Sequence, residues 1–237
     1  MQLEEILQCQ PVWRGASVVQ GRPGAPTGFD ALDAELPGHG WPAGELTEVL
    51  ADAKGIGELQ LVLPTLQALT GAGQRVVWLA PPHVPYPPAL AAAGLDLAQL
   101  AVVRPRTRRE ALWAAEQVLR ASASLALLAW LPRLRYAELQ RLALAAETGR
   151  GLAFLFRPSG AAREPSPAAL RLALESGGAE LIVRLVKRRG APAGRPLRLP
   201  LRLPAGLPGH ALGRSALLPA RDGDDRADRR LGVPVHA

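Results

Sequence analysis

The stretch ELTEVLADAKGIGELQLVL, residues 45–63, decides the fold class of this chain. It reads as an apolar strand, a short loop with two glycines and an amphipathic helix, which is the context in which a GxxxxGK[ST] loop binds ATP phosphates. If Gly57 takes the place of the motif's second glycine, Asp52 replaces the first glycine, Glu58 the lysine and Leu59 the hydroxyl residue. The stretch therefore predicts a degenerate P-loop, in which the backbone is kept and the functional groups are lost.

The acidic residue at position 58 argues against ATP hydrolysis. A working loop needs a cation at this position to hold the terminal phosphates. A carboxylate instead repels each phosphate charge, by roughly 1 kcal/mol per pair at about 4 Å in water and roughly 4 kcal/mol at a protein surface. Gly55 and Gly57 keep the capacity for a weak anion nest, with Lys54 as a cation within the loop. We therefore expect no ATPase activity and no cofactor.

Two further groups of an ATPase are missing in the same register. The strand that would end on a Mg²⁺-binding aspartate reads LALLAWL, so that Ala129 or Trp130 stands in that place. The strand RVVWLA is followed by Pro81 and Pro82, where a carboxylate that activates water is expected. Three absences together favour a non-catalytic protein; the alternative is that the fold is assigned in the wrong register.

The bulk composition fits one α/β domain with appendages. The chain has 237 residues, of which 48% are hydrophobic, enough for a substantial core. The apolar run 125–131 is too short to cross a bilayer, which takes about 20 residues, and the N-terminus MQLEEILQCQ is unlike a signal peptide. One cysteine and four histidines suggest neither an internal disulfide nor a metal cluster. We expect a cytoplasmic protein that does not act at a membrane.

Apolar periodicity predicts strands that alternate with helices, hence parallel crossovers and a sheet covered on both faces. Thr27 is the expected N-cap of the first helix. The expected domains are 1–26 (N-terminal helix and linker), 27–203 (α/β domain) and 204–237 (disordered basic and polar tail). The expected strands are 45–50, 75–80, 100–103, 125–130, 152–156, 180–187 and 197–203, and the expected helices are 27–36, 58–69, 88–93, 107–121, 134–147 and 168–174.

The positive charge of the chain is concentrated near its C-terminal end. Residues 181–221 contain nine of the 28 basic residues and no acidic one, which leaves 28 − 9 = 19 basic against 21 acidic residues elsewhere. Such a segment meets DNA phosphates, an acidic partner or only solvent. Base stacking is not expected, because no aromatic residue is interleaved. The candidate contacts are Arg184, Lys187, Arg188, Arg189, Arg195, Arg198 and Arg202.

The loop PPHVPYPP, with His83 and Tyr86, follows a strand at the carboxyl edge of the expected sheet, where open α/β sheets bind ligands. We interpret it either as a stiff protein-binding epitope or as a structural loop over the vacated nucleotide pocket. Among the tryptophans of the domain, Trp41 in GHGWPAG is expected to be the most exposed.

The order of these pieces resembles the ImuA family. The segments that carry the resemblance are TGFDALDAEL, GWPAGELTEVL, the altered loop, RVVWLAPPHVPYPPAL, AAAGLDL, LWAAEQVLR and LAFLFRP, over about residues 25–204. TGFDALD and GWPAGELTEV also look like the beginning of the RecA core. The resemblance implies a RecA-like, mostly parallel sheet with helices on both faces, and no catalytic residues.

The same resemblance implies a non-catalytic accessory role in SOS-induced, error-prone translesion DNA synthesis. The implied partners are an ImuB-like pseudo-polymerase of the Y family, RecA and, through ImuB, an error-prone C-family polymerase, with DNA as a further contact and the nucleoid as the place of action after damage. The core is also similar to SulA, the SOS cell-division inhibitor that binds FtsZ, through WLAPP, LAWL and FLFRP. We keep a SulA-type inhibitor as the alternative and an active RecA-like ATPase as the third hypothesis.

Overall fold

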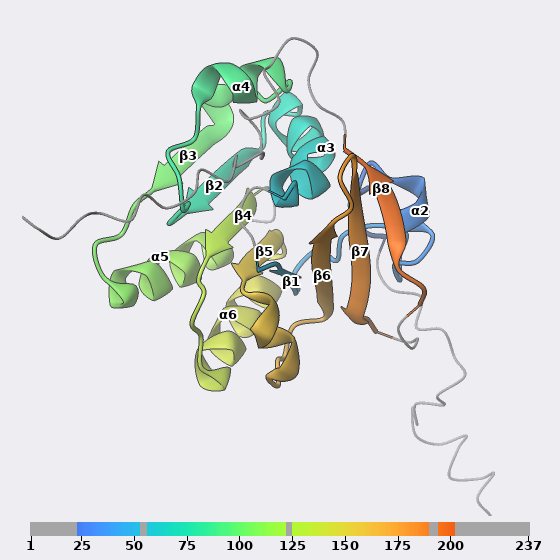
Figure 1. Cartoon of the computed structure of the whole chain (residues 1–237). Helices are drawn as coiled ribbons and strands as arrows, with labels where there is room; N and C mark the ends of the chain where they lie inside the picture. The colour runs from blue at the N-terminus through green and yellow to red at the C-terminus, as the bar shows by residue number, and fades with distance from the viewer. Residues whose placement is uncertain (1–22, 53–55, 122–124, 190–193, 202–237) are drawn as a thin grey trace, which may run out of the picture.

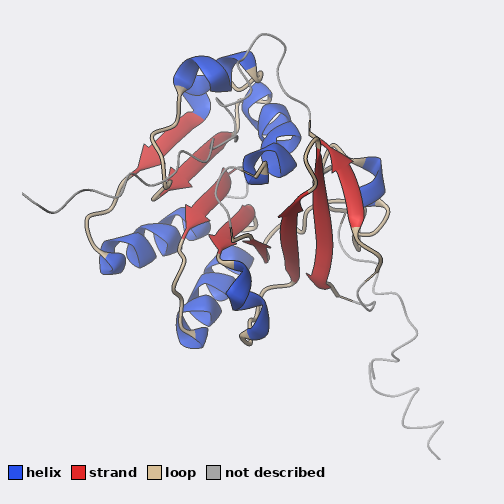
Figure 2. Cartoon of the chain, in the orientation of Figure 1, coloured by secondary structure: helices blue, strands red, loops and turns tan. Residues whose placement is uncertain are grey.

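The computed structural model describes residues 23–52, 56–121, 125–189 and 194–201, which form a sheet of eight strands with helices on both faces (Figures 1 and 2). The strand order across the sheet is β3-β2-β4-β5-β1-β6-β7-β8. Five of the seven neighbouring pairs are parallel, and the pairs β6–β7 and β7–β8 are antiparallel. The predicted α/β class with a mostly parallel sheet is confirmed.

Strand β1 (Leu46–Leu50) lies in the middle of the sheet, between β5 (Leu152–Arg157) and β6 (Leu170–Ser176). All five of its residues are buried, as expected for a strand that is covered on both faces. The other strands are β2 (Arg75–Leu79), β3 (Leu100–Val103), β4 (Leu125–Trp130), β7 (Glu180–Lys187) and β8 (Leu197–Pro200).

The helices divide between the two faces of the sheet (Figure 1). On one face, α2 (Asp30–Asp33), α3 (Glu58–Gly71) and α4 (Pro87–Ala92) contribute Leu32, Leu61 and Leu90, among other residues, to a core that extends to β8. On the other, α5 (Arg108–Ala121) and α6 (Tyr136–Gly149) bury their small and leucine side chains. Two 3-10 turns, η1 (Leu97–Gln99) and η2 (Ser159–Arg163), complete the elements.

The prediction of a helix over residues 168–174 is wrong, because this segment forms strand β6. Its leucines alternate with other residues, so that Leu170, Leu172 and Leu174 face one core while Arg171 faces the other side of the sheet. Arg171 stands at a position that faces the opposite side of the sheet and is itself buried, so the two-residue period of a strand is hard to recognise in this short segment, and its leucines also fit the period of a helix. Pairing with β1 on one side and β7 on the other holds the segment as a strand.

The first expected helix is also shorter than predicted, and Thr27 is not its N-cap. Helix α2 begins after Phe29, and Thr27 is fully buried. The Thr27 hydroxyl accepts a hydrogen bond from the Phe29 N–H at 3.1 Å and so closes a local turn before the helix. Gly28, with φ of 83°, lies against Pro64 of α3 so closely that a Cβ would meet the proline ring at 2.4 Å. The backbone before α2 therefore packs closely against α3.

Trp41 was expected to be exposed and is instead completely buried. Its indole Nε1–H donates to the Thr65 hydroxyl at 2.9 Å, and its ring meets Phe154 edge-on at 5.1 Å. A backbone bridge to Ala25 holds the residue in place, and Gly40 allows this approach because a Cβ there would lie 2.3 Å from the Ala25 carbonyl oxygen. The glycines that suggested an open loop therefore permit close packing.

Candidate functional site

The predicted P-loop lies between β1 and α3, so the expected strand–loop–helix context is present. Lys54 and Gly55 lie outside the described residues. Asp52 is exposed, and its carboxylate accepts hydrogen bonds from the backbone N–H and the hydroxyl of Ser159, the first residue of η2. Gly57 has φ of 107° at the N-cap of α3, a conformation that favours glycine.

The first turn of α3 is covered by a side chain from the C-terminal end of the domain. A Cβ placed on Gly57 would lie 2.7 Å from Cδ2 of Leu201, which shows that the leucine packs against the glycine. A backbone hydrogen bond from the Leu201 N–H to the Ala179 carbonyl, 3.1 Å long, holds the leucine there. Glu58 supplies a carboxylate to the same first turn. An apolar cap and an acidic group thus lie at the helix end where a P-loop would present its backbone to phosphate.

The residues at the carboxyl ends of β4 and β2 take up the places where an ATPase would have its carboxylates. Ala129 is fully buried, and the ring of Trp130 stacks on Phe156 with centroids 4.7 Å apart. Residues 81 and 82, after β2, are prolines. Across the residues that the structure describes, no group of three histidine, cysteine, aspartate or glutamate side chains is placed to hold a metal ion.

The predicted basic residues spread over β7, the segment after it and β8, and four of them are paired with carboxylates. The Arg184–Glu175 and Arg198–Glu180 pairs are exposed and 2.9 and 3.2 Å long. Arg188 and Arg189 reach to Glu35 and Glu45, each at 2.6 Å, and so attach the C-terminal strands to the segment before β1. Arg195 is exposed, and Arg202 lies outside the described residues. Their assignment as DNA or partner contacts stays a prediction.

Lys187 is the remaining member of that set. Its ammonium group donates to the Ser166 carbonyl oxygen at 2.9 Å. Burial lowers the pKa of Lys187, and repulsion from Arg171 and Arg189 lowers it further, while Glu48 acts in the opposite direction. This amine therefore belongs to the edge of a charged network inside the domain.

That network surrounds Glu48, a fully buried carboxylate in the middle of β1. One carboxylate oxygen accepts from Nη1 of Arg157 on β5 at 3.0 Å, and the other accepts from Nε of Arg171 on β6 at 2.5 Å. The remaining nitrogens of Arg171 donate to three backbone carbonyls of residues 161–164. Arg157 also binds Glu164 at 2.7 Å. The network thus ties the three central strands to the segment that contains η2.

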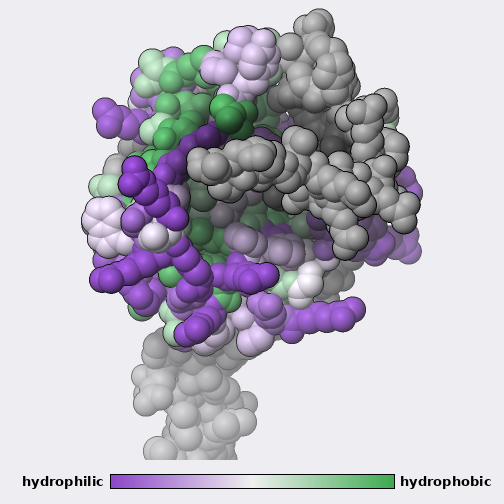
Figure 3. Space-filling view, turned by 60° about the vertical axis from the view of Figure 1, so that its left-hand side comes forward, coloured by the Kyte–Doolittle hydropathy of each residue, from purple (hydrophilic) through white to green (hydrophobic). Residues whose placement is uncertain are grey.

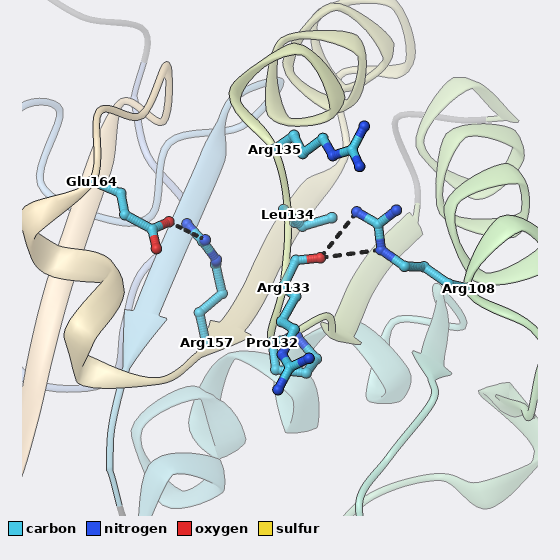
Figure 4. Close-up of a pocket in the computed structure, with 7 residues that line it drawn as sticks. All are labelled: Arg108, Pro132, Arg133, Leu134, Arg135, Arg157 and Glu164. Carbon is cyan, nitrogen blue, oxygen red and sulfur yellow. Dashed lines mark hydrogen bonds and ion pairs between the residues drawn. The ribbon is translucent and has the colours of Figure 1, made fainter.

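A pocket of about 420 Å³ opens beside this network, at the carboxyl ends of β4 and β5 (Figure 4). Its lining residues are Arg108, Pro132, Arg133, Leu134, Arg135, Arg157 and Glu164. Figure 4 shows the Arg157–Glu164 pair on one side of the 132–135 segment and Arg108 on the other, bonded to the Arg133 carbonyl. This edge of an open α/β sheet is where ligands commonly bind.

The start of α6 forms the rim of this pocket. The Glu138 carboxylate accepts a hydrogen bond from the Arg135 backbone N–H at 2.7 Å and pairs with Arg108. Burial alone would raise the pKa of Glu138, but these two interactions outweigh it and hold the pKa below its usual value. The salt bridge joins the first turns of α5 and α6, which fixes both helix starts at the pocket.

Large exposed apolar side chains lie on several elements of the described part of the chain. In the loop after β2, Val84 and Tyr86 are 74% and 59% exposed, which leaves both interpretations of that loop open. Trp113 on α5 is 63% exposed, whereas Trp41, the tryptophan that was expected to be the most exposed, is buried. Figure 3 shows one face of the molecule, on which hydrophobic residues are bordered by hydrophilic ones. The other large exposed apolar residues are Val102, Tyr136, Leu144 and Val186.

Neither the pocket nor the buried charged network was predicted from the sequence. Two signals were present: the arginines of RPRTRRE and PRLR lie at the starts of two helices, and Glu48 is a charged residue within a strand that is buried throughout. Neither signal is a residue spacing that is typical of a known kind of functional site. Only the strand order, which places β4 beside β5 and β5 beside β1, brings these groups together.

The fold and these surfaces define an α/β protein whose core is similar to a family of cell division inhibitors. Residues 44–153, from the start of β1 into β5, match the family model described as cell division inhibitor SulA. A protein described as cell division inhibitor SulA, from Edwardsiella piscicida, is 36% identical over 101 residues. The match takes in 42% of this chain and 60% of that relative, so the chain spans about 60% of the relative's length.

Of the two resemblances given in the sequence analysis, the similarity to SulA is thus supported over residues 44–153, and the resemblance to ImuA stays a prediction. None of the helices in the described residues is long and apolar enough to span a membrane.

Proposed function

We propose that this protein is a non-enzymatic inhibitor of cell division of the SulA type, which binds FtsZ and prevents its polymerisation. The observation that carries the proposal is the SulA match over residues 44–153. The proposal favours the alternative of the sequence analysis over its main hypothesis. A role in the SOS response, and a cytoplasmic location, follow from the same similarity as parts of the proposal.

The position of the exposed apolar residues supports this proposal. Among the residues that the structure describes, six of the seven large exposed apolar side chains belong to the range that resembles SulA, and Val186 lies outside it. Apolar and aromatic side chains are what a protein-binding surface needs at its centre. We assign the partner surface to the loop with Val84 and Tyr86.

The absence of ATPase activity is part of the proposal. Leu201 packs on Gly57, and Glu58 lies in the first turn of α3, so an apolar side chain and a carboxylate stand where the triphosphate would approach. A titration of the protein with ATP and Mg²⁺ tests this point, and tight Mg²⁺-dependent binding would contradict it.

The decisive experiment follows FtsZ polymerisation by light scattering with increasing amounts of the purified protein. We expect inhibition, with the double variant Val84→Ser/Tyr86→Ser at least tenfold less effective. Val186→Ser is the matched control, since it replaces an exposed valine outside the SulA-like range and should inhibit like the wild type. Unimpaired polymerisation at a severalfold excess of the protein would refute the proposal.

A second candidate is an ImuA-type accessory protein of translesion synthesis, acting with an ImuB-like Y-family pseudo-polymerase, RecA and, through ImuB, an error-prone C-family polymerase. The observation that favours it is the part of the domain outside the SulA match: Phe29, Leu32 and Trp41 before it and β6–β8 after it all belong to the same core. Pull-down from damaged cells distinguishes the two candidates by recovering either FtsZ or a polymerase-like protein.

For the second candidate, contact with DNA on the nucleoid remains a proposal that rests on the basic residues of β8 and the segment before it. Arg195 and Arg198 are the suitable residues to neutralise, because both are exposed, whereas Arg188 and Arg189 attach the strands to Glu35 and Glu45. Unchanged DNA affinity of the Arg195→Gln/Arg198→Gln variant at low and moderate salt would exclude these two contacts.

A further inference from the structure

The pocket at the carboxyl ends of β4 and β5 carries an excess of positive charge. Four arginines and one glutamate line it, and Arg133 and Arg135 are exposed and make no ion pair with the other described residues. The positive lining is built from three places in the chain: the first residue of α5, the segment before α6 and the end of β5. Arg108 and Arg157 are paired with carboxylates, so the excess positive charge of the pocket comes from Arg133 and Arg135.

A buried donor in the same pocket has no partner. The Arg157 side chain is only 1% exposed, and its Nη atoms bind Glu48 and Glu164. Its Nε–H finds no acceptor among the described residues. A buried nitrogen of a charged group without a hydrogen bond is unfavourable, and such groups in folded proteins are normally satisfied by protein, water or a ligand.

We propose that this pocket binds a small molecule that carries two or more anionic oxygen groups, such as phosphates or carboxylates. The planar guanidinium group of arginine matches both groups in a bidentate geometry. The volume of about 420 Å³ lies in the range of small-ligand sites. The lining holds no aromatic side chain on which a base would stack, so the ligand is recognised by its charges.

The roles of the residues within this site differ. Arg157 forms the floor, oriented by Glu48 and Glu164, while Arg133 and Arg135 approach the ligand from the segment before α6. Glu164 is 55% exposed and competes with the anion for Arg157. Arg108 is held at the rim by Glu138. The ligand would be bound whether or not the protein acts on cell division.

The first test measures binding of inorganic pyrophosphate and of citrate to the purified full chain by calorimetry at low salt. We expect saturable binding of at least one of them, weakened at least about tenfold in Arg133→Gln/Arg135→Gln. Arg195→Gln is the matched control, because Arg195 is also exposed and without an ion pair among the described residues, and it should leave the affinity unchanged. The two probes tell a phosphate ligand from a carboxylate ligand.

The second test removes the competing carboxylate. Glu164→Gln should tighten binding severalfold, because it removes a negative charge from the pocket and releases an Arg157 nitrogen. Glu175→Gln breaks an exposed arginine pair of similar exposure, 53% against 55%, whose two residues do not line the pocket, and should have no effect. The proposal is refuted if neither probe binds saturably, or if the control variants change the affinity as much as the pocket variants do.

Discussion

Replacing Glu48 by glutamine should remove a large part of the stability of this domain. The carboxylate is completely buried and is shared by Arg157 and Arg171, whose side chains are 1% and 6% exposed. Glutamine keeps the shape of the side chain and removes its charge, so Arg171 loses its carboxylate partner and Arg157 keeps only Glu164. The change is therefore electrostatic, with little change in packing volume.

The expected loss follows from the burial of all three side chains. Removing one member of a buried ion pair costs about 3–5 kcal/mol, out of a total stability of about 5–15 kcal/mol for a typical domain. For a domain of this size, each 1 kcal/mol corresponds to about 2–4 °C in Tm, so we expect a decrease of roughly 6–20 °C. Glu175→Gln, in an exposed pair, should cost no more than about 1 kcal/mol.

The assay is equilibrium unfolding in urea, followed by tryptophan fluorescence and by circular dichroism. Combining Glu48→Gln with Arg171→Met should cost less than the sum of the two single substitutions by at least about 1 kcal/mol, because the two residues contact each other. If Glu48→Gln unfolds within 1 kcal/mol of the wild type, or if the double variant is strictly additive, the buried network does not hold the central strands together.

Three further outcomes can be checked in the same assay. Gly149→Ala should lower the free energy of unfolding by roughly 3 kcal/mol, because its Cβ would lie 1.7 Å from a backbone carbonyl oxygen of α5. Gly71→Ala has open space around it and should be neutral or raise the stability by about 0.5 kcal/mol. Equal effects of the two substitutions would contradict this. Trp41→Phe should cost about 1–3 kcal/mol through a lost buried hydrogen bond and lost packing, and a neutral result would mean that the residue is exposed after all. Glu138→Gln should lower the free energy of unfolding by about 1 kcal/mol at pH 7. Because the folded-state pKa of Glu138 is lowered from 4.5, the difference in stability from the wild type should disappear as the pH falls below about 4.5. A difference that does not depend on pH would contradict the pairing with Arg108.

The sequence predicted the elements that have a clear period and failed where tertiary contacts decide. The predicted strand at residues 45–50 and the helix after it were correct to within a residue at their start, because burial on both faces and an amphipathic face leave strong patterns. Residues 168–174 were misread since Arg171 is buried by an ion pair that only the assembled sheet supplies. Trp41 was misplaced for a similar reason, as its glycine neighbours serve a backbone contact with a segment 16 residues earlier.

The candidate sites were less predictable than the fold. A motif with a known spacing directed attention to the loop at residues 52–58. The arginines of the pocket, by contrast, include Arg108, Arg133 and Arg157, which are 24 or more residues apart in the sequence. No single-sequence pattern joins such positions. The concentration of basic residues near the C-terminal end is visible in the sequence, but the carboxylate partners of Arg188 and Arg189 are Glu35 and Glu45, more than 140 residues earlier in the chain.

The position of β1 has a practical consequence for anyone who divides this chain. The range that resembles SulA begins at residue 44 and ends at residue 153, yet β1 pairs with β6 beyond that range and its core includes Phe29 and Trp41 before it. A fragment cut at the limits of similarity would lose β6 and all but the first two residues of β5, which leaves both edges of the central strand largely unpaired and exposes a layer of leucines. Such a fragment should aggregate when expressed alone, so the unit of likeness between these proteins is smaller than the unit that folds.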